Sequence, residues 1–430
     1  MDLQFAVVLL LGVFFISVLL GLHIVYALGM ASIVTALYLK LPMQVIVQAI
    51  VGKLGNFALM AVPFFILAGE LMSVGGISDR LIKLSRSLVG WMRGGLAQVN
   101  IVASMFFGGI SGSAAADTAS LGAILIPMMK KDGYDEEFAT NITMTSSVQG
   151  ILIPPSHNMV IYAVAAGGVS ISKLFMGGLV PGMFMGLCLM IYCMIAARKH
   201  NYPRGDAFSL RNVIACLKES VWALGTVLIV VFGVMTGIFT ATESAAIAAI
   251  YAFVVAYFVY KDAPLSSLKK VLSNTIRTMS TILILSSCAT AFSFLITYLQ
   301  IPQMLAEFLM GFAGNRILLL LMINLFLLIL GTFMNMVSII LIVTPILLPV
   351  VTGIGMDPVH FGVMLIMNLG IGLLTPPVGN VLFVGSSVSG VPIERLAKTI
   401  LPQLAVMVLA LLIITFVPAF SMALPNFLMK

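Results

Sequence analysis

The stretch Gly-Ile-Leu-Ile-Pro-Pro-Ser-His-Asn occupies residues 150–158, and Gly-Leu-Leu-Thr-Pro-Pro-Val-Gly-Asn occupies residues 372–380. The two stretches share a glycine, a leucine, a proline pair and an asparagine at one offset of 222 residues. Proline removes a backbone donor and disfavours the helical conformation of the residue before it, so a proline pair unwinds a helix. The sequence therefore predicts two related broken helices, over residues 138–168 and 361–390.

Further matches at the same offset indicate that the whole chain is an internal repeat. Residues 124–127 correspond to 346–349, and residues 168–174 correspond to 390–396. Agreement over prolines and glycines at a single offset is hard to obtain by chance, even in an apolar sequence. We expect two repeats, residues 1–220 and residues 221–430.

Each half also contains a Gly/Ser-rich interruption within an apolar region. Residues 108–117 interrupt the region 94–129, and residues 331–338 interrupt the region 317–351. The flanks are each about half a membrane span long, because a full span needs about 20 residues. Both ends of each region lie on one side of the membrane by charge, so we expect two re-entrant hairpins.

The composition is typical of a polytopic membrane protein built from helices. The chain has 430 residues, of which 61% are hydrophobic and 9% charged, and its mean hydropathy is +1.17. A soluble domain carries about 25% charged residues, which argues against a soluble enzyme, a nucleic-acid binder or a disordered scaffold. We expect an all-α fold with about 10 transmembrane helices besides the two hairpins. The four cysteines lack CxxC spacing and are interpreted as small apolar side chains.

Basic clusters predict the orientation in the membrane. They span residues 80–93, 198–218 and 261–277, and cytoplasmic loops are where such clusters gather. Counting helices outward from the clusters places both termini in the periplasm. Between the second and third clusters the chain crosses twice, with a periplasmic turn near residues 240–243. The two halves then have inverted topology, as in many secondary transporters.

Oxygen atoms at the helix breaks predict two sodium sites near the middle of the membrane. Unwound backbone at that depth is tolerated only where protein, water or an ion satisfies its carbonyl groups. We expect each hairpin tip to meet the broken helix of its own half. The candidate sodium ligands are Ser111, Ser113, Asp117, Ser146, Ser147 and Gly150 in the first half, and Gly331, Asn335, Ser338, Gly372 and Thr375 in the second.

Structural explanations stay open for several of these residues. A Gly/Ser/Ala run in a membrane helix is often a close-packing face, and a proline pair alone is often a kink. Asp117 can bond backbone groups of its own hairpin, although a carboxylate within a membrane is functional by default. Glu243 follows Thr240 at the start of a helix, where it can serve as a capping residue or as a site residue.

Polar residues around the proline pairs are the candidate substrate contacts. They are Ser156, His157, Asn158 and Asn380. His157 can serve as a substrate contact, a proton acceptor or a buried hydrogen-bonding group, and these alternatives stay open. The sequence contains no HExxH, GxSxG or GxxxxGK[ST] motif, so we expect neither an enzyme nor ATP hydrolysis by this chain. Any pumping must then use an ion gradient or another subunit.

Five motifs resemble those of one transporter family. They are Gly-Ile-Ser-Gly-Ser-Ala-Ala-Ala-Asp-Thr-Ala (109–119), Ile-Pro-Pro-Ser (153–156), Thr-Ala-Thr-Glu-Ser-Ala-Ala (240–246), Leu-Thr-Pro-Pro-Val-Gly (374–379) and Ser-Gly-Val-Pro-Ile-Glu-Arg (389–395). The chain resembles the large membrane subunit of a tripartite ATP-independent periplasmic (TRAP) transporter from its first helix to its C-terminal end.

The resemblance implies sodium-coupled uptake of an organic acid across the bacterial inner membrane. It implies two protein partners, a soluble periplasmic substrate-binding protein and a small four-helix membrane subunit, which we expect as a separate polypeptide. It also implies an elevator motion, in which the hairpins and broken helices slide against a scaffold. No cofactor is expected besides Na⁺ as the coupling ion.

Two departures from the family pattern bear on the substrate. His157-Asn158 follows the Pro-Pro-Ser of the first proline pair, and Asn380-Val381 follows the Pro-Pro-Val-Gly of the second pair. Dicarboxylate-type members commonly have other residues at both places. By likeness to sialate-type members, we expect a sialic acid as the substrate. The alternative is a stand-alone sodium- or proton-coupled carboxylate transporter that works without a binding protein.

Overall fold

The structure is a computed structural model, and its described part is helical throughout. It describes residues 3–22, 24–52, 60–205, 207–235, 238–301, 304, 316–376 and 379–429. Within these ranges no β-strand is formed. The first four helices are α1 (Leu3–Leu19), α2 (Ile24–Tyr38), α3 (Met43–Gly52) and α4 (Ala61–Val74). The last three are α19 (Ile393–Thr399), α20 (Leu401–Phe416) and α21 (Ala419–Leu428).

Each half contains a helical hairpin followed by a broken helix. In the first half the hairpin is α6 (Gly95–Ser111) and α7 (Ala114–Lys131), and the broken helix is α8 (Glu136–Gly150) and α9 (His157–Ala165). In the second half the hairpin is α15 (Arg316–Phe333) and α16 (Met336–Gly353), and the broken helix is α17 (Pro358–Gly372) and α18 (Asn380–Ser389). These bounds lie within a few residues of those expected from the proline pairs and glycines. The opposite orientation of the two halves stays a prediction.

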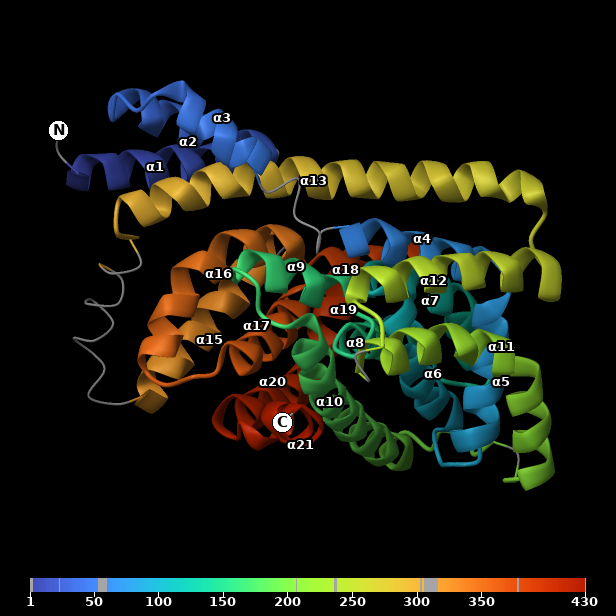
Figure 1. Cartoon of the computed structure of the whole chain (residues 1–430). Helices are drawn as coiled ribbons and strands as arrows, with labels where there is room; N and C mark the ends of the chain where they lie inside the picture. The colour runs from blue at the N-terminus through green and yellow to red at the C-terminus, as the bar shows by residue number, and fades with distance from the viewer. Residues whose placement is uncertain are drawn as a thin grey trace.

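The two halves interlock through their broken helices. Helix α9 packs on α16, an arm of the second hairpin, and α18 packs on α7, an arm of the first. Helices α8 and α17 lie at the centre, where every residue from Ala139 to Gly150 and from Val359 to Gly372 is buried. The helix breaks of both halves are thereby brought into one region of the molecule (Figure 1).

Long helices surround this centre. Helix α13 (Leu268–Tyr298) runs across one side of the molecule in Figure 1 and packs on α2, α3, α4 and α16. Helix α10 (Ile171–Lys199) packs on α6, α17, α20 and α21. Helix α11 (Leu210–Met235) packs on α5 (Ile77–Val89) and α12 (Ala241–Val254). A π-helix at Val255–Val259 continues α12, and a short 3-10 helix at Leu265–Ser267 precedes α13.

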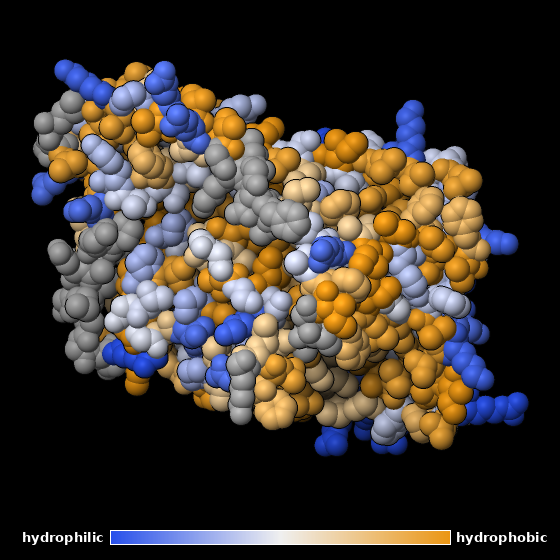
Figure 2. All heavy atoms as spheres, viewed as in Figure 1, coloured by the Kyte–Doolittle hydropathy of each residue, from blue (hydrophilic) through white to orange (hydrophobic). Residues whose placement is uncertain are grey.

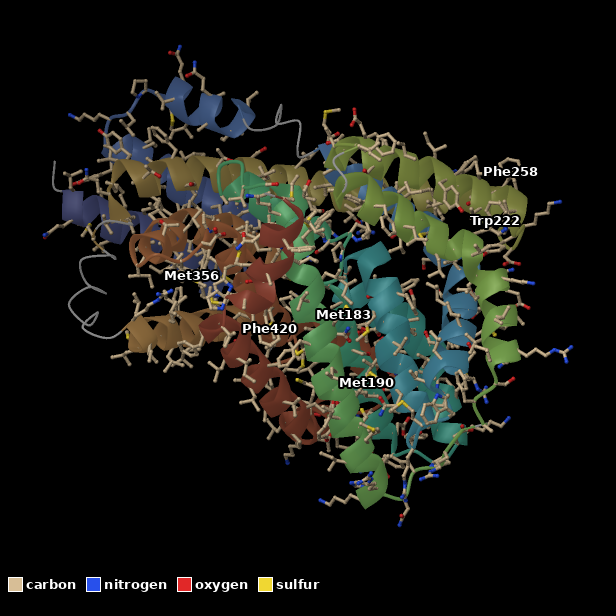
Figure 3. The ribbon with its side chains drawn as sticks, turned by 60° about the horizontal axis from the view of Figure 1, so that its bottom comes forward. Met183, Met190, Trp222, Phe258, Met356 and Phe420 are labelled. Carbon is tan, nitrogen blue, oxygen red and sulfur yellow. The ribbon has the colours of Figure 1, made fainter. Side chains whose placement is uncertain are left out.

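Length and composition identify the membrane spans. In the described part of the chain, five helices are long and apolar enough to cross a bilayer, or up to seven when each of two bent pairs is counted as one span. The expected count of about 10 spans depends in addition on apolar helices of 10–17 residues. Large apolar side chains cover much of the face in Figure 2. Figure 3 shows Trp222 of α11 and Phe258, just beyond α12, at the edge of the molecule.

Three details differ from the sequence-based picture or refine it. The basic residues Arg80, Lys83 and Arg86 lie on a helix, α5, and not on a loop. The expected border between residues 220 and 221 falls inside α11, and it stays a prediction. Glu243 accepts a hydrogen bond from the backbone N–H of Thr240, and the Thr240 hydroxyl accepts one from the backbone N–H of Glu243. The capping interpretation of Glu243 is therefore confirmed.

Glycines permit a sharp elbow between α4 and α5. The two helices meet at an angle of 75°, and Gly76 has a φ of +66°, which glycine adopts without strain. A Cβ atom on Gly75 would lie 2.5 Å from the Cβ atom of Ala256 in the π-helix. The elbow therefore packs against the end of α12 with no room for a side chain.

We predict that Gly75→Ala lowers the stability of the purified protein by about 1–3 kcal/mol, because the added methyl group overpacks this contact. Thermal unfolding in detergent measures the effect. Gly353→Ala is the matched control, since a Cβ atom at Gly353 in α16 meets no atom within 4 Å. Unfolding of Gly75→Ala at the temperature of the unaltered protein would contradict the packing argument.

Candidate functional site

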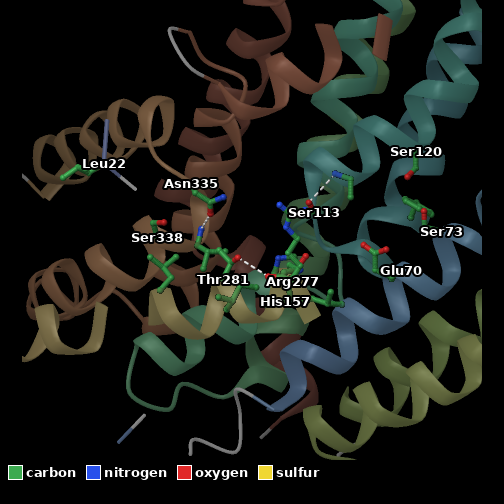
Figure 4. Close-up of a pocket in the computed structure, with 18 residues that line it drawn as sticks. Leu22, Glu70, Ser73, Ser113, Ser120, His157, Arg277, Thr281, Asn335 and Ser338 are labelled. Atoms are coloured by element: carbon green, nitrogen blue, oxygen red, sulfur yellow. Dashed lines mark hydrogen bonds between the residues drawn. The ribbon is translucent and has the colours of Figure 1, made fainter. Parts of the chain in front are cut away.

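Both hairpin tips line one cavity of about 650 Å³. Asn335 and Ser338 of the second hairpin lie on one side of it, and Glu70, Ser73 and Ser120 lie on the other (Figure 4). Ser113 of the first tip, His157 and Arg277 lie between them. The remaining lining residues are Leu22, Ile66, Gly69, Phe107, Ala116, Thr278, Thr281, Ile282, Leu285 and Val337. The volume is in the range of small-molecule sites, about 300–1,000 Å³.

The first tip lies against the start of α9. Gly112 turns the chain with a φ of +63°, and the Ser113 hydroxyl accepts a hydrogen bond from the backbone N–H of Ala116 at the start of α7. The Asn158 side chain donates a hydrogen bond to the Gly112 carbonyl at 3.0 Å. A Cβ atom on Gly112 would lie 2.4 Å from Nδ1 of His157. This tip therefore requires glycine, and Asn158 holds it in place.

The second tip has a related arrangement. Asn335 is the N-cap of α16, and its side-chain oxygen accepts a hydrogen bond from the backbone N–H of Val337 at 2.9 Å. The backbone N–H of Gly379 donates to the Thr332 carbonyl at 3.2 Å, which joins the break between α17 and α18 to this hairpin. Residues 377–378 of this break lie outside the described residues. Each tip thus meets the broken helix of its own half, as expected from the sequence.

Glycine pairs bring hairpin and broken helix into backbone contact in both halves. A Cβ atom on Gly150 would lie 2.6 Å from the Ser104 carbonyl oxygen and 2.9 Å from Cα of Gly108. A Cβ atom on Gly372 would lie 2.6 Å from Cα of Gly331. The close-packing explanation therefore holds for these glycines, whatever ion their carbonyl groups bind.

Buried polar contacts cross the same two interfaces. The Ser146 hydroxyl on α8 donates to Oδ1 of Asn100 on α6 at 3.2 Å. In the second half, Asn368 donates to Oδ1 of Asn324 at 2.8 Å. Ser146 and Asn368 are matched positions at the offset of 222 residues. The sequence analysis did not single out Asn100 or Asn324, because only packing shows that they face α8 and α17.

The other predicted sodium ligands are distributed over this region. Asp117 is fully buried, with Oδ2 3.5 Å from the ideal Cβ position of Gly150. Ser147 donates to the Thr143 carbonyl at 2.8 Å, and Thr375 donates to the Ile371 carbonyl at 3.0 Å. The side chain of Ser111 lies outside the described residues. That these groups bind Na⁺ stays a prediction.

Of the four candidate substrate contacts, His157 is the one that lines this cavity. Ser156 is fully buried, and its hydroxyl has no hydrogen-bond partner among the described residues. Asn158 is committed to the first tip, as described above. Asn380 is exposed at the start of α18 and does not line the cavity.

Arg277 is a further candidate, which the sequence pattern did not single out as a site residue. It belongs to the third basic cluster and lies within α13, on the wall of the cavity. Asn274, Arg277, Thr278 and Thr281 follow the spacing of one helical face, which is the signal that identifies them as a polar stripe. Asn274 also donates to Oε2 of Glu70 at 3.1 Å, which joins α13 to α4 beside the cavity.

A second cavity, of about 950 Å³, adjoins the first. Ser73 and Ser120 line both cavities. The second is also lined by Arg80, Lys83 and Lys218, from the first two basic clusters. Arg80 pairs with Asp262, and its guanidinium lies 3.7 Å from the centre of the Tyr260 ring. The pocket between the tips therefore adjoins a second cavity with basic residues in its wall.

Comparison with known families decides the class of this protein. Residues 11–420 match the family described as "Tripartite ATP-independent periplasmic transporter, DctM component". The chain belongs to this family. It is therefore a TRAP transporter large permease, a multi-pass membrane protein that transports organic acids and is not an enzyme.

Two relatives illustrate the range of substrates. The "C4-dicarboxylate TRAP transporter large permease protein DctM" of Rhodobacter capsulatus is 36% identical and covers 98% of this chain and 99% of its own length. The "Sialic acid TRAP transporter large permease protein SiaM" of Vibrio cholerae serotype O1 is 39% identical and covers 88% of each chain. The similar identities do not distinguish between the two substrates.

A solved structure shares the fold. The YdaH transporter of Alcanivorax borkumensis superposes with a TM-score of 0.64 at 14% sequence identity, and covers 87% of this chain and 88% of its own. At this identity the likeness concerns the fold alone. This chain and the YdaH transporter therefore share an overall fold.

We predict that Gly150→Ala destabilises this permease by about 1–3 kcal/mol in buffers with either Na⁺ or K⁺, because the methyl group meets the Ser104 carbonyl whether or not an ion is bound. Thermal unfolding in the two buffers measures this. Gly12→Ala is the control, since a Cβ atom there meets nothing within 4 Å. A loss of stability confined to the Na⁺ buffer would instead assign Gly150 to ion binding alone.

Proposed function

We propose that this protein imports an organic acid across the bacterial inner membrane by sodium symport. A periplasmic substrate-binding protein delivers the acid, and a small four-helix membrane subunit completes the transporter. Both termini then lie in the periplasm, as the basic clusters indicate. The observation that carries the proposal is the single cavity lined by both hairpin tips and by Arg277.

Arg277 is the group proposed to bind the anion, in a cavity whose wall also carries the Glu70 carboxylate. A guanidinium group binds a carboxylate through two parallel hydrogen bonds, and it keeps its charge at any physiological pH. The serine, threonine and asparagine side chains around it, among them Ser113, Thr281 and Asn335, add uncharged hydrogen-bonding groups. Such groups suit the carboxylate and hydroxyl oxygens of an organic acid.

Sodium is proposed to bind where tip and broken helix meet in each half. The Asp117 carboxylate is fully buried beside Gly150, and the Ser156 hydroxyl is buried with no hydrogen-bond partner among the described residues. A buried hydroxyl without a hydrogen bond costs free energy that an ion or water recovers. Na⁺ at this position also offsets the negative charge of a substrate in the adjoining cavity, which couples the two binding events.

The transport step is proposed to be an elevator motion. The hairpins and broken helices interlock as one body, whereas α13 and α4 border the cavity from outside it. Sliding of that body would carry the tips past Arg277 and Glu70. The second cavity shares Ser73 and Ser120 with the first. It then offers a route by which the substrate leaves toward the side that carries Arg80, Lys83 and Lys218.

Sialic acid is the proposed substrate within the class of organic acids. Of the two departures that motivate it, His157 is in a position to contact a ligand in this cavity, whereas Asn380 is exposed away from it. His157 therefore supports the proposal and Asn380 does not. A sialic acid has many hydroxyl groups and one carboxylate, which suits a cavity where Arg277 and several neutral polar side chains accompany the Glu70 carboxylate.

Reconstitution with the cognate small subunit tests coupling and delivery. We predict that uptake into vesicles requires both an inward Na⁺ gradient and the periplasmic binding protein loaded with substrate. The reason is that Na⁺ must occupy the cation sites and the delivered acid must occupy the cavity before the transport step. Uptake of radiolabelled sialic acid, with K⁺ replacing Na⁺ as the control, measures the effect.

Two outcomes separate the alternatives. Equal uptake with K⁺ alone would refute sodium coupling. Efficient uptake of free substrate without the binding protein would favour the stand-alone carboxylate transporter.

We predict that Arg277→Gln raises the substrate concentration for half-maximal transport by roughly ten- to a hundredfold, because a charge-assisted hydrogen bond of about 1.5–3 kcal/mol is lost. Arg277→Lys should keep part of the affinity, since it retains the charge. Lys270→Gln, an exposed change on the same helix outside the cavity, is the control. An unchanged half-maximal concentration in Arg277→Gln would remove Arg277 from the site.

A further inference from the structure

A separate groove of about 320 Å³ lies between α5 and α11. The lining residues used below are Lys83, Arg86, Trp91, Phe208, Asn212 and Glu219. None of these residues lines the cavity between the hairpin tips. Lys83 and Glu219 also line the second cavity, so the groove adjoins that cavity but is separate from the one between the tips.

Helical spacing explains how the groove forms. On α5, Lys83 and Arg86 are three residues apart and therefore lie on one face. On α11, Asn212 and Glu219 are seven residues apart and also share a face. Helices α5 and α11 pack side by side (Figure 1), so these two faces border one seam. Ser87 and Gly90 also line this seam, and because they are small they leave space between the two helices.

The surroundings of the groove are those of a membrane surface. Leu210, Ile214 and Leu217 form an apolar stripe on the neighbouring face of α11 and are exposed by 64%, 46% and 46%. Trp91 and Phe208 close one end of the groove with ring centres 6.3 Å apart, and both are half exposed. Exposed aromatic rings beside an apolar stripe are typical of the boundary between lipid tails and headgroups.

Charge identifies the class of occupant. Among the described residues that line the groove, two are cationic, Lys83 and Arg86, and one is a carboxylate, Glu219, so the formal charge of this lining is positive. Both basic side chains are exposed. A lipid phosphate with one negative charge neutralises such a groove, whereas a zwitterionic headgroup does not. Basic pockets between helices at the cytoplasmic surface are suited to anionic headgroups.

We propose that this groove binds the phosphate of an anionic glycerophospholipid, such as phosphatidylglycerol. Lys83 and Arg86 hold the phosphate oxygens, and the Asn212 amide is within the same groove to bind the glycerol oxygens. The first acyl carbons lie over Trp91 and Phe208, and the tails follow the apolar stripe of α11. The lipid thereby joins α5 to α11 at the membrane surface.

The test uses the full-length protein, purified in detergent and stripped of lipid. Binding of phosphatidylglycerol, phosphatidylethanolamine and phosphatidylcholine is measured by native mass spectrometry and by thermal unfolding with each added lipid. The variant Lys83→Gln/Arg86→Gln removes both charges. Lys269→Gln/Lys270→Gln removes two exposed charges from α13, outside the groove, and is the matched control.

We expect the first variant to bind phosphatidylglycerol roughly ten- to thirtyfold more weakly, given the contribution of each basic residue to anionic-lipid binding. The control variant should bind it as the unaltered protein does. Lys83→Arg/Arg86→Lys keeps both charges and should retain binding, which separates the charge effect from a folding defect. Millimolar inorganic phosphate alone should not raise the unfolding temperature, because it lacks the acyl chains.

Several results would overturn the proposal. They are phosphatidylglycerol binding no tighter than that of the two zwitterionic lipids, an equal loss in the α13 control, loss of binding in the charge-retaining variant, and full protection by inorganic phosphate. The last result would assign the groove to a free anion.

Discussion

The need to satisfy backbone polar groups at membrane depth governs this structure. A carbonyl or N–H group without a partner in a bilayer costs several kcal/mol, so a helix breaks only where other protein groups or water reach the break. Here each break is met by a hairpin tip of the same half. Asn158 donates to the Gly112 carbonyl, and the Gly379 N–H donates to the Thr332 carbonyl. The glycine pairs Gly108–Gly150 and Gly331–Gly372 permit that approach.

The polar cavity follows from the same constraint. The two hairpins and the two broken helices each leave backbone polar groups without helical partners, and lipid offers none. The four elements pack together when the halves interlock, with α9 on α16 and α18 on α7, so that lipid is kept away from these groups. The tips and the break beside His157 then share one cavity in which polar side chains reach water or ligand. A cavity with polar and charged walls thus forms where the backbone already requires polar surroundings.

The outer helices add charge to a centre that is rich in neutral oxygen atoms. Helix α13 is 31 residues long, and its polar stripe brings Arg277 to the cavity wall. The elbow at Gly75 and Gly76 turns α5 away from α4, and α5 packs on α11. The fold therefore separates Arg277, which lines the cavity between the tips, from Lys83 and Arg86, which line the groove between α5 and α11.

The sequence by itself determined the helices, the two hairpins and the two broken helices, because prolines and glycines act on the backbone next to them. Its motifs also indicated the family. Only the tertiary structure decided which side chains meet: Arg277 of the third basic cluster lines the cavity, and Asn380 lies outside it. The contacts of Asn100 with Ser146 and of Asn324 with Asn368 were equally hidden. Local rules state where a helix ends, but the face that it turns to a distant helix depends on how the whole chain packs.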